Sequence, residues 1–161
     1  MLNQLHLAML ELYKGDAKRI QHFCKVHSYA KLIAECENVD KETLFILEAA
    51  ALTHDIGIRL CEEKYGDCSG KLQEKEGPAI AARLLGKLGF EKQVSERVQY
   101  LIAHHHTYQN IDGLDYQILV EADFLVNLFE DNLSKEATVN AYQNIFKTET
   151  GKRICKEMFA L

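Results

Sequence analysis

Apolar residues along this chain recur with the 3.6-residue period of an α-helix almost from end to end. Few stretches alternate apolar and polar residues, and few concentrate β-branched residues, which are the patterns typical of strands. The chain has one proline and no visible repeat or low-complexity tract. These features predict an all-α fold, a single compact bundle of several helices.

Capping residues and helix breakers set the expected boundaries. Asp16 and Asp40 stand where N-caps are needed, before residues 17–36 and 41–54. Residues 61–77 are charged and contain three glycines, so we expect a loop or lid there. Pro78 is expected in the first turn of the following helix. The other expected helices cover residues 2–13, 78–88, 91–104, 115–131 and 134–147, with a last one near the C-terminus.

At 161 residues, the chain is long enough to enclose one hydrophobic core. We expect a single domain over residues 1–161, with its core in residues 16–130. Residues 134–161 form an amphipathic segment that is expected to pack on this core. The alternative for that segment is the interface of a homodimer.

Composition limits the classes of function. The hydrophobic fraction is 47%, which is ordinary for a globular protein. The net charge of −5 argues against binding to a nucleic-acid polymer, which needs a basic surface. No apolar run approaches the roughly 20 residues of a membrane-spanning helix. The N-terminus shows no signal-peptide pattern, and the five cysteines are scattered without a C-x-x-C pair. We therefore expect a cytoplasmic protein with reduced thiols, no disulfide framework and no membrane association.

Residue types that often bind metals fall on the apolar faces of the expected helices. His22 shares its face with Val26 and Ile33, while Asp123 shares its own with Leu119 and Val126. His54-Asp55 ends the apolar run before it. Alone, each group is more typical of a core histidine, a cap or an ion pair. Together they favour a metal site, because helices of a bundle bring such groups to one point.

The order His22, His54-Asp55, Asp123 on successive helices resembles the HD-domain superfamily of metal-dependent phosphohydrolases. The run AAALTHDIG around His54-Asp55 and the run EAD ending at Asp123 match as well. The resemblance spans roughly residues 16–130. It implies an all-helical fold with a divalent metal bound by His22, His54, Asp55 and Asp123.

Nitrogen and oxygen ligands without thiolate suit Mn, Fe, Co, Ni, Mg or Zn. A divalent cation lowers the pKa of a water molecule that it binds and polarises a phosphoryl oxygen. We expect hydrolysis of a phosphate ester, in a nucleotide or another small phosphorylated metabolite, with metal-activated water as the nucleophile. Asp55 would orient or deprotonate that nucleophile besides binding the metal.

His104, His105 and His106 follow at the end of an expected helix. His104 and His105 are expected near the site, as ligands of a second metal or as the acid that protonates the leaving oxygen. Two-metal members of the superfamily usually carry a further histidine where this chain has residues 74–77. Glu76 is the one substitute there, so one metal is expected and two is the alternative.

Arg59, four residues after Asp55, is the first candidate for binding the substrate phosphate, because arginine suits bidentate contact with phosphate. Lys64, Lys71, Lys75 and Arg83 are further candidates. Two other functions stay open. The chain could be a regulatory module that binds a metal or ligand without turnover, or a metal-dependent oxygenase on the same fold.

Overall fold

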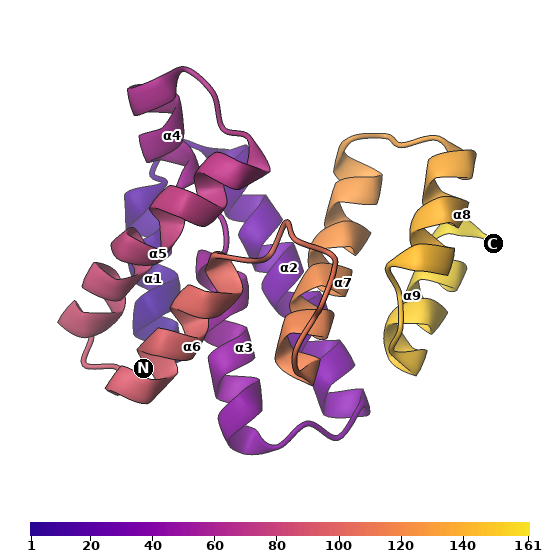
Figure 1. The fold of residues 1–161 in the computed structure, drawn as a ribbon, viewed down its shortest axis with the longest axis horizontal. Coiled ribbons are helices and arrows are strands. Elements are labelled where there is room, and N and C mark those ends of the chain that lie inside the picture. The colour runs from indigo at the N-terminus through magenta and orange to yellow at the C-terminus, as the bar shows by residue number, and fades with distance from the viewer.

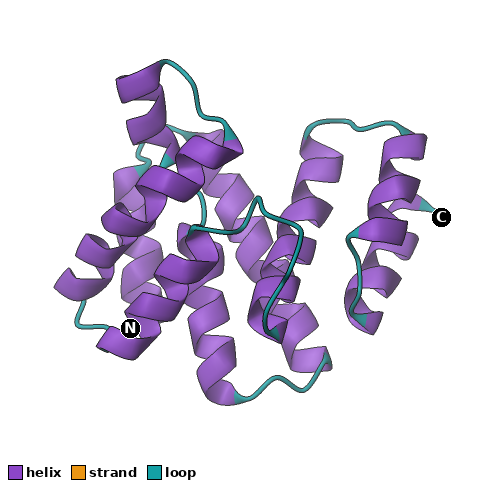
Figure 2. Cartoon of the chain, viewed as in Figure 1, coloured by secondary structure: helices purple, strands orange, loops and turns teal.

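The structure is a computed structural model that describes residues 1–161. It contains nine helices and no strand, so the predicted all-α fold is confirmed (Figures 1 and 2). The helices are α1 (Leu2–Leu12), α2 (Ala17–Cys36), α3 (Lys41–Thr53), α4 (Ile58–Tyr65), α5 (Gly70–Lys87), α6 (Lys92–Ile102), α7 (Leu114–Glu130), α8 (Lys135–Asn144) and α9 (Glu149–Phe159).

The two predicted N-caps are confirmed. The Asp16 carboxylate accepts a hydrogen bond from the backbone N–H of Arg19 at the start of α2. The Asp40 carboxylate accepts from the backbone N–H groups of Glu42 and Thr43 at the start of α3. These bonds satisfy N–H groups that have no partner inside the helix, and they fix where α2 and α3 begin.

The expected loop or lid over residues 61–77 is wrong. Residues 58–65 form α4 and residues 70–87 form α5, so only residues 66–69 are left between them. Gly66, with φ of +65°, is a true turn residue. Gly70 and Gly77 are helical, and close packing explains the absence of a side chain. A Cβ on Gly70 would lie 2.7 Å from the His106 ring, and one on Gly77 would lie 2.8 Å from Ile102 Cγ2.

Pro78 stands inside α5 instead of in its first turn. Proline has no N–H, so the Glu74 carbonyl loses its helix partner there. The helix continues through this break because one face, Gln73, Gly77, Ala81 and Leu85, is buried at intervals of four residues. Tertiary packing of this face outweighs the local cost of the proline.

The centre of the bundle is α2, which packs against α3 on one side and α7 on the other. In Figure 1, α1, α4, α5 and α6 lie on the left of α2 and α3, while α8 and α9 form a hairpin on the right beyond α7. The hydrophobic core is continuous and includes Phe23, Ile33, Leu52, Leu101 and Leu125. No helix has the length and apolar character needed to cross a membrane.

Candidate metal centre

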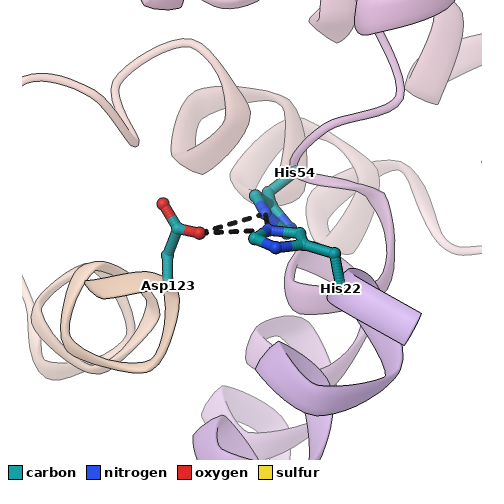
Figure 3. Close-up of side chains that lie close together, drawn as sticks. All are labelled: His22, His54 and Asp123. Atoms are coloured by element: carbon teal, nitrogen blue, oxygen red, sulfur yellow. Dashed lines mark hydrogen bonds and ion pairs between the residues drawn. The ribbon is translucent and has the colours of Figure 1, made fainter. Parts of the chain in front are cut away.

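Helix ends and the buried faces of two helices bring the polar residues of the core together. His54 is the C-cap of α3, and Asp55 follows it in the turn that leads to α4. His22 comes from α2 and Asp123 from α7, and both side chains point to the same place from opposite sides (Figure 3). His105 and His106 lie in the turn after α6.

His22, His54 and Asp123 form a compact group. His22 Nε2 lies 3.2 Å from His54 Nε2 and 3.2 Å from Asp123 Oδ1 (Figure 3). His54 Nε2 lies 3.6 Å from the same carboxylate oxygen. All three side chains are buried, with His54 fully inaccessible to solvent. Two ring nitrogens and one carboxylate oxygen therefore face a common point, in an arrangement that could hold a metal ion.

Asp55 lies between this group and a second one. Its Oδ2 is 3.4 Å from His22 Nε2 and 3.5 Å from His54 Nε2. Its Oδ1 is 3.5 Å from His105 Nε2, and with His105 and His106 it forms a second set of atoms that could hold an ion. The two oxygens of one carboxylate thus face two neighbouring positions.

His105 Nε2 provides a test of whether a cation fits. This nitrogen is buried and makes no hydrogen bond. The Nδ1 atom of the same ring donates to the backbone carbonyl of Ile102 at 2.7 Å, so in the neutral ring, which is the form that binds a cation, Nε2 carries the lone pair. A buried nitrogen lone pair without a partner is costly in an apolar core. A divalent cation beside Asp55 would satisfy it, and the residues present fit such a group.

In the metal-free state, protons bound by the histidines offset the charges of the carboxylates. Burial alone would lower the pKa of His54, but the carboxylates of Asp55 and Asp123 outweigh it and raise the pKa to about 9. Burial alone would raise the pKa of Asp55, but His54 and His105 outweigh it and lower the pKa to about 2. The pKa of Asp123 is likewise held far below its usual range by His22 and His54, against the effect of burial.

A cleft of about 390 Å³ opens beside the two groups. Its lining is mostly polar, with Lys18 and Arg19 as its basic residues. Arg19 is held by Asp16 at 2.6 Å and by Glu62 at 2.5 Å. The other lining residues are Asp16, His22, Asp55, Ile58, Cys68, Gln73, His106, Asp123, Asn127, Glu130 and Asp131.

His106 forms part of the cleft wall. Gln73 donates through Nε2 to the Cys68 carbonyl at 2.7 Å, so its Oε1 accepts from His106 Nε2 at 3.3 Å. Burial, with a smaller effect from His105, lowers the pKa of His106 to about 4. The His106 ring is therefore neutral near pH 7.

Several residues expected at the site lie elsewhere. Arg59 is exposed, and its guanidinium donates to Glu63 and to the Leu12 carbonyl, away from the cleft. The side chain of His104 hydrogen-bonds to the Tyr100 carbonyl, and the centroids of the two rings lie 4.2 Å apart, outside both groups. Glu76 binds Lys64 and Tyr65 instead of approaching the centre. The other cations suggested by the sequence, Lys64, Lys71, Lys75 and Arg83, do not line the cleft.

The geometry explains these differences. Arg59 is in the first turn of α4 and points outward, although it is close to Asp55 in sequence. His104, His105 and His106 occupy a tight turn, so consecutive side chains point in different directions. Only His105 and His106 face the centre.

Several residues that line the cleft were not predicted from the sequence, although helical spacing carried a signal for some of them. Arg19 precedes His22 by three positions in α2, and this spacing alone places it on the same helix face. Asn127 and Glu130 follow Asp123 by four and seven positions in α7, which again keeps to one face. Gln73 had no such signal, because its segment was expected to be a loop.

The sequence and the fold resemble those of known proteins. The family model for the HD domain matches residues 19–141. The crystal structure of a predicted HD superfamily hydrolase from an uncultured Thermotogales bacterium is similar, with 26% sequence identity and a TM-score of 0.69. That match covers 98% of this chain and 84% of the other. A comparison with curated proteins gave no match.

Proposed function

The chain belongs to the HD-domain family, a family of metal-dependent hydrolases, and from this premise we propose that it hydrolyses a phosphate ester of a nucleotide or another small metabolite. The observation that carries the proposal is the convergence of His22, His54 and Asp123 with Asp55 beside a polar cleft. Buried ionisable groups with strongly shifted pKa values in a cleft are typical of active sites.

The proposed ligands of the first ion are His22, His54, Asp123 and the Oδ2 atom of Asp55. Asp55 Oδ1, His105 and His106 would hold a second ion if one binds. A divalent cation in this place would polarise a phosphoryl oxygen and lower the pKa of the attacking water. The mixed nitrogen and oxygen donor set is compatible with Mn, Fe, Co, Ni, Mg or Zn.

Side chains around the cleft would bind the substrate phosphate and orient the attacking water. Lys18 and Arg19 carry positive charge on the cleft wall, so we assign them to the substrate phosphate in place of Arg59. Asp55 is ionised, with its pKa near 2, and would accept a hydrogen bond from the attacking water and orient it. His106 is neutral near pH 7, so it is better suited to binding than to donating a proton.

The test combines elemental analysis with a hydrolysis assay. Wild type and Asp55→Ala are analysed for bound metal and then assayed with p-nitrophenyl phosphate, nucleoside monophosphates and sugar phosphates. We expect bound metal and hydrolysis in the wild type, with both reduced in Asp55→Ala, and activity lowered roughly hundredfold or more. Asp67→Ala is the matched control, because Asp67 is exposed in the loop between α4 and α5.

Equal rates for wild type and Asp55→Ala at matched metal concentration would contradict the proposal. A wild-type protein that binds metal and phosphate compounds but releases no product would favour the regulatory module instead. Oxygen consumption in the presence of iron would favour the oxygenase.

A further inference from the structure

The three buried histidines of the centre are oriented in two different ways. His54 and His105 stand just beyond helix ends, where carbonyls of the preceding turn have no helix partner. Their Nδ1 atoms donate to the carbonyls of Ala51 and Ile102, at 2.9 and 2.7 Å. No side-chain substitution can remove those acceptors, because both belong to the backbone.

His22 has no such acceptor available. It lies in the second turn of the 20-residue helix α2, where backbone carbonyls are used by the helix itself. Its ring needs an acceptor from another element. Glu130, at the end of α7, supplies one, with Oε2 at 2.9 Å from His22 Nδ1.

Glu130 is itself held in place by a cation. Its Oε1 lies 2.5 Å from Lys25 Nζ, and Lys25 follows His22 by three positions on α2. At this distance Lys25 and Glu130 form an ion pair, which favours the charged form of the carboxylate. An ionised carboxylate can only accept hydrogen bonds, so His22 Nδ1 must be the donor. His22 Nε2 then faces Asp123 and His54.

We propose that Glu130 is the positioning residue of the centre, which fixes the ring of His22 so that Nε2 is presented to the metal. This inference rests on the proposed function, since it takes His22 as a metal ligand. Glu130 lies two helical turns after Asp123, so one face of α7 supplies both a ligand and the support of another ligand.

Metal affinity tests the inference directly. Mn²⁺ is titrated by calorimetry into the metal-free forms of wild type, Glu130→Ala, Glu130→Gln and Lys25→Met. Loss of a carboxylate that orients a histidine ligand typically weakens metal binding by roughly 10- to 100-fold, and we expect a loss of this size in Glu130→Ala. Glu130→Gln keeps an oxygen that can accept from Nδ1, so its loss should be smaller.

Lys25→Met separates positioning from ion pairing, because it removes the cation and leaves the carboxylate on His22. Its Mn²⁺ affinity should fall much less than that of Glu130→Ala. Thermal melts of the metal-free proteins check that each variant folds.

Equal losses in Lys25→Met and Glu130→Ala would overturn the inference, since the ion pair between α2 and α7 would then carry the effect. Glu130→Ala with the affinity of the wild type would overturn it as well. A wild type that binds no Mn²⁺ would remove the inference together with the metal site. A wild type that binds Mn²⁺ but hydrolyses no phosphate ester would contradict the proposed function and leave the role of Glu130 intact.

Discussion

At the scale of single residues, protons and a divalent cation compete for the same side chains. Without metal, His54 is stabilised in its protonated form, with its pKa raised from 6.5 to about 9. A cation needs the neutral imidazole, so metal binding must displace that proton. The centre is therefore expected to be sensitive to pH in its metal-free form.

In the metal-free protein, the contributions of His54 and Asp55 to stability should both be complete only between about pH 4 and 6.5, whereas the contribution of neutral His106 is lost as the pH falls from 6.5 through about 4. A raised pKa means that the His54 contribution is complete below 6.5 and is lost as the pH rises through about 9. The lowered pKa of Asp55 means that its contribution is complete above 3.8 and is lost as the pH falls through about 2. The alkaline loss is at most about 3 kcal/mol. Urea unfolding of metal-free protein at pH 7, 8 and 9, where the contribution of His106 is constant, measures it, and equal free energies of unfolding would contradict the coupling.

The same competition predicts how metal changes the melting temperature. Because bound cations require neutral histidines, Mn²⁺ should bind more tightly at pH 8.5 than at pH 6. The rise in melting temperature on adding saturating Mn²⁺ should therefore be larger at pH 8.5. Differential scanning calorimetry with and without metal at the two pH values gives the comparison. A larger rise at pH 6 would contradict it.

Arg19 and Arg59 allow a matched test of the phosphate site. Arg19 lines the cleft, whereas Arg59 faces away from it. Loss of a charge-assisted hydrogen bond to phosphate should raise KM about tenfold in Arg19→Ala, with a smaller change in kcat. Arg59→Ala should leave both constants unchanged. Steady-state kinetics on the best substrate decides between them, and the reverse pattern would restore the assignment to Arg59.

At the scale of helices, the approach of α5 to the His54-Asp55 turn depends on two glycines. A Cβ on Gly57 would lie 3.0 Å from the Gly77 nitrogen and 3.1 Å from its Cα, both backbone atoms. Since φ at Gly57 is −79°, close packing and not backbone strain requires glycine there. Gly57→Ala should therefore destabilise the fold by about 1–3 kcal/mol.

Gly86 is the control for this substitution. It lies in the same helix as Gly77, is exposed, and a Cβ there would meet no atom within 4 Å. Gly86→Ala should stabilise the protein by about 0.5–1 kcal/mol, because alanine loses less backbone entropy in a helix. Urea denaturation of both variants checks the pair. Similar effects at the two positions would show that packing at Gly57 is looser than the structure indicates.

The sequence predicted helices well where local signals decide their ends. Asp16 and Asp40 are caps, and their side-chain bonds need nothing beyond the first helical turn. Residues 61–77 were mispredicted because Gly70 and Gly77 looked like turn residues. Their role is to admit His106 and Ile102, which lie far along the chain. Such contacts leave no local trace in a single sequence.

The same distinction between local signals and distant contacts applies to the site residues. His22 and Asp123 were placed at the centre by helical spacing, and the structure brings them together with His54. Arg59 was suggested by closeness in sequence to Asp55, but its side chain contacts Glu63 and the Leu12 carbonyl and does not line the cleft. The contact of Glu130 with His22 depends on how α7 crosses α2. Helical periodicity within one segment does not predict that crossing.

At the scale of the whole molecule, one buried carboxylate ties the C-terminal hairpin to the bundle. Glu121 on α7 is fully buried and accepts hydrogen bonds from the backbone N–H groups of Lys147 and Thr148, at 2.6 and 2.9 Å. Its Oε2 accepts from the hydroxyl of Thr148, the N-cap of α9. The start of α9 is thus attached to a residue of α7 that lies two positions before Asp123.

Gly151 makes this attachment possible, because a Cβ there would overlap the Glu121 carboxylate. Gly151→Ala should destabilise the protein by about 2 kcal/mol through displacement of that carboxylate. Glu121→Ala should cost about 3 kcal/mol, since it leaves buried N–H groups without acceptors. Removal of Glu121 relieves the most severe clash at position 151 and leaves only Thr148 Oγ1, at 2.7 Å. The double variant should therefore be more stable than the sum of the single effects predicts. Urea denaturation of the four proteins measures this coupling, and strict additivity would mean that the hairpin is held by its apolar contacts instead.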